Sequence, residues 1–320
     1  MFIKCDTIKI RTNYKYLKEE KITFAPQYNF QHNKELGRYF NSKHNTQMPY
    51  NLYIATNYYH QTLEIEFSSK ILKERYSELI SRDTIRQCLE NINDLGICTI
   101  DVDGILRNSW VIRADITKDV DLPLTDDVLN ALNDNVGNYR RYTWQHYDGK
   151  GITFTKNVMR NKDEITVYNK YTELLQHSRN FMDSLPQEAR NKIMDYFYGK
   201  TRFEVRMKNS KQIEERLGVN RLMDFFNSVD NVVREQFNRV FDVSAKVLDM
   251  SKFRDYDEWA MAQILNAFNG DLRQIEQMLR SGSIYNSRNG LTERMKKFES
   301  VKLITNKAEN EILKRVRSLL

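Results

Sequence analysis

Charged side chains fall on one face of three predicted β-strands, and this pattern is the strongest indication of chemistry in the sequence. In a strand, residues i and i+2 point to the same side. Segments 113–119, 164–170 and 202–206 each bring polar side chains onto one face in this way. These side chains are Arg113, Asp115, Thr117 and Asp119, then Glu164, Thr166, Tyr168 and Lys170, and finally Arg202, Glu204 and Arg206.

If the three strands belong to one sheet, their polar side chains could bind a metal ion and a phosphate together. Several carboxylates without a cysteine cluster suit a hard divalent cation, Mg²⁺ or Mn²⁺, while arginine and lysine suit phosphate. A tyrosine in such a place can act as a nucleophile that accepts a phosphoryl group. A half-solvated antiparallel sheet shows the same alternation without any site, so both interpretations stay open.

Other motifs in the sequence are weaker. The chain has no Gly-x-x-x-x-Gly-Lys-Ser/Thr or Gly-x-Gly-x-x-Gly motif, which argues against nucleotide hydrolysis and dinucleotide binding. His146 lies between two of the three strands and is a reserve metal ligand, although a lone histidine is more often structural. Arg140 and Arg141, flanked by Tyr139 and Tyr142, suit contact with a single nucleic-acid strand, or a helix end that packs its tyrosines.

Composition and charge narrow the class of protein. The 320 residues are 40% hydrophobic and 29% charged, which is typical of a globular chain. No apolar run is long enough for a membrane helix, and three dispersed cysteines favour the reducing cytoplasm. The net charge is +7, and segments 1–50 and 288–320 each carry nine Lys or Arg against four Asp or Glu. Basic ends favour a polyanionic partner such as nucleic acid, or serve only solubility.

Hydrophobic periodicity predicts an α+β fold with a central, mainly antiparallel sheet flanked by helices, followed by a mostly helical region. Predicted strands cover residues 52–56, 62–67, 98–102, 110–120, 151–155, 164–168 and 202–207, with a turn at Asp103-Gly104. Predicted helices begin at Ser81 or Asp83, at Asp126 and at Ser184, the first ending near Gly96 and the third at Gly199. Helical periodicity continues over 211–241, 256–268, 271–280 and 291–300.

Four segments resemble, in order, the rolling-circle replication initiators of phages and plasmids, the filamentous-phage gene II type and its plasmid relatives. The most specific part is Tyr-x-Lys-x-x-Glu, followed about thirty residues later by Arg-x-Glu. The His-hydrophobic-His metal motif of the wider superfamily is absent, and carboxylates replace part of it in the plasmid relatives. The resemblance spans roughly residues 60–240, on segments 64–72, 113–119, 168–174 and 202–204.

The resemblance implies a metal-dependent enzyme that nicks and rejoins one strand at a replication origin. A tyrosine attacks a phosphodiester and becomes linked to the 5′ phosphate, and the freed 3′ hydroxyl primes synthesis by a host polymerase, with a host helicase as a further partner. The bond energy is kept in the phosphotyrosine, so no ATP is needed. The implied substrate is origin DNA that is single-stranded or melted, because nicking needs single-stranded character.

Carried onto this sequence, the resemblance assigns roles to particular residues. Tyr168 holds the family position of the nucleophile, with Tyr171 as the competing choice. Lys170 would steady the scissile phosphate or the departing oxygen, and Glu173 would pair with Lys170 or with an arginine. The remaining roles are metal ligands for Asp115 and Glu204, with Asp119 and His146 in reserve, and phosphate contacts for Arg113, Arg202 and Arg206.

The predicted domain organisation is a nicking endonuclease domain over 1–210 and a mostly helical domain over 211–320. The latter would contain a winged-helix-like DNA-binding module, or helices that pack on the sheet or form a homodimer. Three other functions stay open: a mobilisation relaxase or transposase of the same chemistry, a non-catalytic origin-binding protein, and a metal-dependent nuclease that uses water instead of a tyrosine.

Overall fold

The computed structural model divides into two compact units, and each unit combines two segments of the chain. The first unit comprises Met1–Pro123 and Val158–Val233, and the second comprises Leu124–Asn157 and Arg234–Leu320. The predicted linear boundary at residue 210 stays a prediction about function. The structure describes residues 2–29, 34–44, 48–137, 141–147, 151–156, 164–241, 244–246, 253–282, 288–304 and 306–320.

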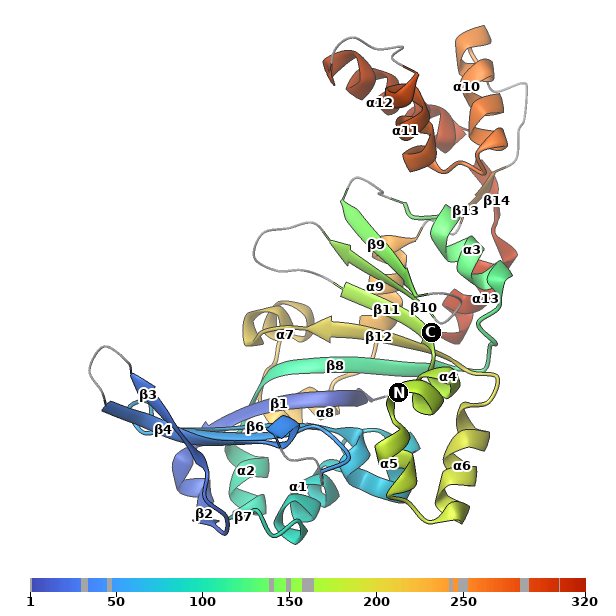
Figure 1. Cartoon of the computed structure of the whole chain (residues 1–320). Coiled ribbons are helices and arrows are strands. Elements are labelled where there is room, and N and C mark those ends of the chain that lie inside the picture. Colours follow the sequence, from blue (N-terminus) through green and yellow to red (C-terminus); the bar gives the residue numbers. More distant parts are fainter. Residues whose placement is uncertain are drawn as a thin grey trace. The chain divides into compact units, whose positions relative to one another are not determined.

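An antiparallel sheet forms the centre of the first unit (Figure 1). Its described strands follow the order β3-β4-β5-β6-β1-β8-β12-β11. This arrangement confirms the predicted α+β class, and it confirms that residues 52–56 and 62–67 form a hairpin. The strands are β3 (Ala25–Asn29), β4 (Lys34–Asn41), β5 (Leu52–Asn57), β6 (Thr62–Ser68), β1 (Cys5–Asn13), β8 (Trp110–Val120), β12 (Thr201–Met207) and β11 (Glu164–Asn169).

One face of this sheet is apolar and forms the core of the unit. Ile8, Ile65, Ile116 and Val205 from four successive strands are buried, and each such side chain contributes about 1.5–3 kcal/mol of hydrophobic free energy. Helix α2 (Val102–Asn108) contacts β1, while α7 (Ser210–Leu217) and α8 (Leu222–Asn227) contact β8. The alternation of the strands therefore leaves the opposite face to the polar residues.

A group of helices encloses one end of the polar face. Figure 1 shows α4 (Lys170–His177), α5 (Arg179–Asp183) and α6 (Gln187–Phe197) side by side at this end of the sheet. The 3-10 helix η3 (Ser69–Glu78) contacts α6 and contributes Tyr76. The Tyr76 ring lies 5.2 Å from the Phe181 ring and 5.8 Å from the Phe197 ring, between centroids. These aromatic contacts hold the helices against the polar residues that the sheet presents there.

The predicted strand pair around Asp103-Gly104 is wrong. Strand β7 (Cys98–Ile100) pairs with β2 (Leu17–Glu20), and Asp103 and Gly104 lie inside helix α2. The Asp101 side chain caps this helix, because it accepts a 2.8 Å hydrogen bond from the Gly104 amide. A Cβ atom at Gly104 would lie 2.3 Å from the Tyr16 ring, so this glycine serves close packing, not a turn.

The starts of two helices also differ from the prediction, while their ends agree with it. Helix α1 (Ile85–Asp94) follows Thr84, and α6 follows Pro186, whereas the predicted caps are Ser81 or Asp83 and Ser184. The Ser184 hydroxyl donates instead to the Phe181 carbonyl, at 2.7 Å. Local hydrogen bonds of this kind compete with capping.

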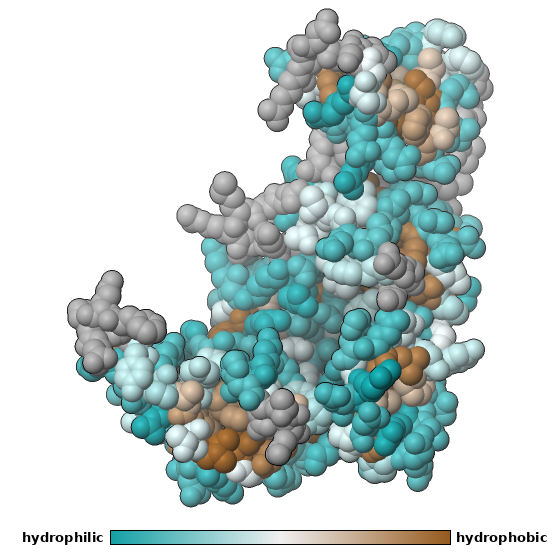
Figure 2. All heavy atoms as spheres, in the orientation of Figure 1, coloured by the Kyte–Doolittle hydropathy of each residue, from teal (hydrophilic) through white to brown (hydrophobic). Residues whose placement is uncertain are grey.

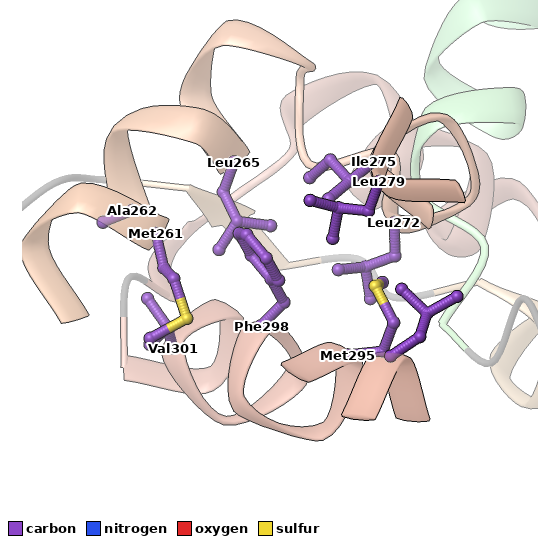
Figure 3. Close-up of a cluster of buried hydrophobic side chains, with 10 residues drawn as sticks. Met261, Ala262, Leu265, Leu272, Ile275, Leu279, Met295, Phe298 and Val301 are labelled. Carbon is purple, nitrogen blue, oxygen red and sulfur yellow. The ribbon is translucent and has the colours of Figure 1, made fainter. Parts of the chain in front are cut away.

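The second unit is mainly helical, as predicted, and it has its own core. Side chains of α10, α11 and α12 turn toward one another in Figure 3 and bury ten residues, Phe298 and Met295 among them. The hairpin β9–β10 also belongs to this unit. The elements are α3 (Asp126–Asp134), β9 (Tyr142–Tyr147), β10 (Gly151–Lys156), β13 (Ser244–Lys246), α10 (Tyr256–Ala267), α11 (Leu272–Ser281), α12 (Arg288–Ile304), β14 (Asn306–Glu309) and α13 (Glu311–Leu319), with α9 (Val232–Val240) crossing the boundary.

The surface is predominantly polar. Hydrophilic residues cover most of the face drawn in Figure 2. Among the residues that the structure describes, no helix has the length and apolar character required to span a membrane. The predicted winged-helix-like character of the last helices stays a prediction.

Candidate active site

The sheet brings the three predicted polar segments together, because β12 lies between β8 and β11. Glu204 pairs with Thr117 on one side and with Thr166 on the other. In the same register, Arg202 lies between Asp119 and Tyr168. Cross-strand partners on one face have Cβ atoms about 4.5–5.5 Å apart, so the polar side chains of all three strands meet.

Tyr168 lies at the end of β11 and is bound to a carboxylate. Its hydroxyl donates a 3.1 Å hydrogen bond to Glu204 Oε2. The ammonium of Lys170 lies 5.6 Å from the centre of the Tyr168 ring. Burial raises the pKa of the Tyr168 phenol well above its usual value, and Glu204 adds to this effect while Lys170 opposes it. The phenol therefore stays protonated until a base removes its proton.

Two buried carboxylates, Asp115 and Glu204, lie beside this tyrosine. Arg206 bridges them, since its Nε donates to Asp115 at 3.2 Å and its Nη2 to Glu204 at 3.3 Å. Burial raises the pKa of Glu204 to about 7, and the charges of Asp115 and Asp6 contribute to the shift. Burial likewise raises the pKa of Asp115, against the opposing effect of Arg206. This part of the site thus holds more negative charge than it readily tolerates.

The carboxylate pair fits the chemistry of a divalent metal ion. Mg²⁺ is commonly held by one or two carboxylates together with substrate phosphates and water. Asp115 and Glu204 supply such a pair, and their raised pKa values reflect a site that a cation would neutralise. Within the described part of the chain, no cluster of three or more His, Cys, Asp or Glu residues could hold a metal. Phosphate and water oxygens would therefore have to complete the coordination.

Arg202 and Asp119 form a buried ion pair beneath the tyrosine. The Arg202 side chain is fully buried, and its Nε and Nη2 donate to the two Asp119 oxygens at 2.7 and 2.9 Å. Its Nη1 donates to Asp6 at 3.0 Å. The structure therefore places Arg202 in the interior and Asp119 on this arginine, away from the carboxylate pair at Asp115 and Glu204.

Asp6 belongs to this cluster, and the sequence pattern did not identify it. The residues on either side, Cys5 and Thr7, pair with the adjacent residues Ile116 and Asp115, so Asp6 is the extra residue of a β-bulge. Burial raises the pKa of Asp6, but Lys170 and Arg202 outweigh it and lower the pKa below its usual range. The one available signal was a carboxylate at the position where the alternation requires an apolar side chain.

Lys170 is buried and held by a chain of polar contacts from three elements. Its Nζ lies 2.6 Å from Glu173 Oε2, which confirms the predicted pairing of these two residues. Glu173 also accepts a 2.9 Å hydrogen bond from the Ser178 hydroxyl, which in turn accepts one of 2.7 Å from Lys70. Burial lowers the pKa of Lys170, but Tyr168 and Tyr76 have the larger combined effect and raise it well above normal.

The other predicted residues lie at different distances from this centre. Arg113 is close, since it pairs with Glu66 at 3.0 Å and approaches Asp115 at 3.6 Å. Tyr171 lies in the first turn of α4, and its ring contacts the exposed Tyr198 ring at a centroid distance of 5.7 Å.

Three of the predicted residues belong to segments outside the first unit. His146 lies on β9 of the second unit, where its Nε2 is 3.1 Å from Asn133 Oδ1. Arg141 is exposed in the same unit. Arg140 lies outside the described residues. Their predicted roles stay predictions.

The site and fold belong to a replication-associated class of protein. Residues 85–229 match the family model that describes the N-terminal part of the phage replication-associated protein encoded by gene II. This segment contains Asp115, Tyr168, Lys170 and Glu204, and the match confirms the resemblance to phage gene II-type replication initiators. It supports a role in the initiation of rolling-circle replication. No curated protein matches the chain.

Proposed function

We propose that this protein starts rolling-circle replication by nicking one strand of origin DNA, with Tyr168 as the nucleophile. The observation that carries the proposal is the hydrogen bond from the Tyr168 hydroxyl to Glu204, beside a second buried carboxylate and between cationic side chains. A tyrosine with a proton acceptor in place is prepared for nucleophilic attack. The family match supports the initiator role, and the chemistry is our inference from the arrangement.

In the proposed step, the Tyr168 oxygen forms a bond to the phosphorus atom of the DNA strand. The bond from phosphorus to the 3′ oxygen breaks, so the protein becomes linked to the 5′ phosphate. Glu204 accepts the phenol proton, and the departing 3′ oxygen takes a proton from solvent. Reversal of these steps rejoins the strand without ATP, because one phosphodiester is exchanged for another.

Asp115 and Glu204 would hold a divalent cation, Mg²⁺ or Mn²⁺. When bound, the ion would supply positive charge to the phosphate under attack. Arg206 bridges the same two carboxylates, and in this proposal it moves to the DNA backbone when the ion binds. Arg113 lies at the other side of Asp115 and would contact a neighbouring phosphate.

Lys170 has a positioning and electrostatic role in this proposal. Its ammonium lies over the Tyr168 ring and is held by Glu173. A fixed positive charge in a buried place stabilises developing phenolate character more than the same charge in water would. The freed 3′ hydroxyl would then be extended by a host polymerase, with a host helicase opening the duplex.

The proposal is tested with denaturing gels of the wild-type, Tyr168→Phe and Tyr171→Phe proteins. Each protein is incubated with Mn²⁺ and labelled single strands tiled along the replicon that encodes it. We expect a covalent protein–DNA band that is lost only in Tyr168→Phe. Loss only in Tyr171→Phe would keep the function and move the nucleophile to Tyr171, whose place in α4 is one turn further along the chain.

The same gels distinguish the other functions. Cleavage without a covalent band in any variant would indicate a nuclease that uses water. Binding without any cleavage would indicate a non-catalytic origin-binding protein. A relaxase or transposase would also form the tyrosine adduct, but on strands from a transfer origin or an element end.

A further inference from the structure

A polar cavity lies on the first unit, in strands that precede the segment matched by the family model. Its volume is about 580 Å³. The wall comes from β1, β3, β5, β6 and the turn between β5 and β6, which lie side by side in Figure 1. The lining residues are Arg11, Gln27, Tyr53, Ala55, Thr56, Asn57, His60, Thr62 and Glu64.

This cavity opens on the same face of the sheet as the candidate active site. Lys9 pairs with Arg113 on β8 and with Glu66 on β6, and Tyr53 on β5 pairs with the same Glu66. Directly paired residues share a face. The ion pair between Arg113 and Glu66 continues the polar row from Asp115 toward β6. Three strand spacings separate β12 from β6, which is roughly 14 Å at about 4.8 Å each.

The lining combines an aromatic ring, cations and hydrogen-bonding side chains. The ammonium of Lys9 lies 5.1 Å from the centre of the Tyr53 ring. Arg11 binds Glu64 through Nε and Nη2 at 2.9 and 2.6 Å, yet half of its side chain remains exposed. Gln27 and His60 are exposed at the edge of the cavity. Such a wall can stack a base, hydrogen-bond its edge and contact its phosphate.

Exposed aromatic side chains surround the cavity. In the turn between β5 and β6, Tyr58 is 43% exposed and Tyr59 is 80% exposed. The Asn57 side chain fixes this turn, because it accepts a 2.9 Å hydrogen bond from the His60 amide. Aromatic rings interleaved with cations are the usual platform for a single nucleic-acid strand.

We infer that this cavity binds one unpaired nucleotide of the same DNA strand that Tyr168 attacks, with the base against Tyr53 and its phosphate at Arg11. The inference rests on the proposed function for the identity of the strand. A concave polar site on a sheet face cannot enter a duplex groove, whereas it can receive a base that is turned out of the stack. The pocket would therefore fix which nucleotide lies a set distance from the scissile phosphate.

The first test measures binding of short fluorescent single strands by anisotropy, in EDTA so that no cleavage occurs. Two variants of the full chain alter the pocket: Tyr53→Leu, and Gln27→Ala combined with His60→Ala, whose side chains are exposed. Loss of a base-stacking contact corresponds to roughly a 5- to 100-fold weaker Kd, and we expect both variants to weaken binding. Lys192→Ala is the matched control, because Lys192 is an ion-paired cation on α6, and we expect no change.

The second test locates the nucleotide. A series of oligonucleotides lacks one base at a time, and one position should weaken wild-type binding while leaving Tyr53→Leu unaffected. Binding equal to wild type in both pocket variants would overturn the inference. So would an equal loss of affinity on a blunt duplex, or the absence of any position whose effect depends on Tyr53.

These outcomes are separate from those of the proposed function. Tyr53→Leu should still form the covalent adduct at saturating oligonucleotide, because Tyr168 and Glu204 are unchanged. A chain that never forms an adduct, yet shows the position-specific loss of binding, would refute the nicking function and leave the nucleotide pocket in place.

Discussion

Glu204 is the residue on which the pH dependence of the site is expected to centre. Its pKa is raised from the usual 4.5 to about 7, so the folded protein binds the carboxyl proton more tightly than the unfolded chain does. Folding is therefore favoured fully below about pH 4.5, and this contribution is lost as the pH rises through about 7. The raised pKa corresponds to at most about 3 kcal/mol.

Glu204→Gln should remove this loss of stability. The substitution keeps an oxygen that can accept the Tyr168 hydrogen bond but does not ionise. We expect the difference in the free energy of unfolding between variant and wild type to change in favour of the variant between pH 5 and pH 8, as measured by urea denaturation in EDTA. Parallel pH dependence of the two proteins would contradict the assignment.

Arg202 is expected to contribute to stability more than to DNA contact. Its guanidinium is fully buried between Asp119 and Asp6. Replacing it with leucine leaves two buried carboxylates without their partner, which should cost about 3–5 kcal/mol in the free energy of unfolding. Urea denaturation tests this, with Arg11→Ala as the control, since Arg11 forms an exposed ion pair whose loss should cost no more than about 1 kcal/mol.

The alternation of single residues predicted the polar face but not all of its members. Asp115, Tyr168 and Glu204 follow the strict period of two within their strands, so the sequence was sufficient to group them. Asp6 enters the same cluster only through a β-bulge, which shifts the period by one residue. The burial of Arg202 also depended on helices far away in the sequence, so no local pattern could indicate it.

At the scale of elements, the contact between β4 and β5 depends on Gly37. A Cβ atom at this position would lie 1.9 Å from the Thr56 carbonyl oxygen, which belongs to the backbone of β5 and the cavity wall. Gly37→Ala should therefore push the two strands apart, at a cost of about 1–3 kcal/mol. It should also weaken single-strand binding although no lining side chain changes.

Thermal denaturation and the anisotropy titration together check the Gly37→Ala expectation. Glu35→Ala serves as the control on the same strand, because Glu35 forms only a partly exposed ion pair with Arg38. A Gly37→Ala protein with unchanged midpoint and affinity would show that β4 adapts without disturbing the cavity.

Element types were predictable where hydrophobic periodicity was strong, and less so at short connections. The strands at 62–67 and 202–207 and the long helices after 250 follow their periodic patterns closely. Asp103-Gly104 is a common turn signal, yet it lies in a helix because Asp101 supplies the cap and Tyr16 leaves room only for glycine. Tertiary packing decided this segment against its local preference.

At the scale of the whole molecule, the second unit has a core of its own. Phe298 is buried among side chains of α10, α11 and α12, so Phe298→Ala should cost about 3–5 kcal/mol. Hydrogen exchange should show lost protection in those helices and not in the sheet of the first unit. Lys297→Ala, exposed on the same helix, is the control, and equal loss of protection in both units would contradict separate cores.

The division into units was the feature least accessible from the sequence. Periodicity indicates what a segment forms, but it does not indicate which distant segment it joins. Residues 124–157 look like ordinary parts of the first half of the chain, yet their contacts place them with residues 234–320. A linear boundary near residue 210 was the simplest expectation that local patterns allowed.

The position of β8 in the sheet has a consequence for the order of events during synthesis. This strand lies between β1, near the start of the chain, and β12, which begins about eighty residues after β8 ends. A nascent chain can therefore pair one edge of β8 early, while its other edge must wait for the ribosome to make β12. During that interval an unpaired central strand is exposed, and long-range pairing of this kind is intrinsically slow. The carboxylate pair, contributed by β8 and β12, cannot assemble before that interval ends.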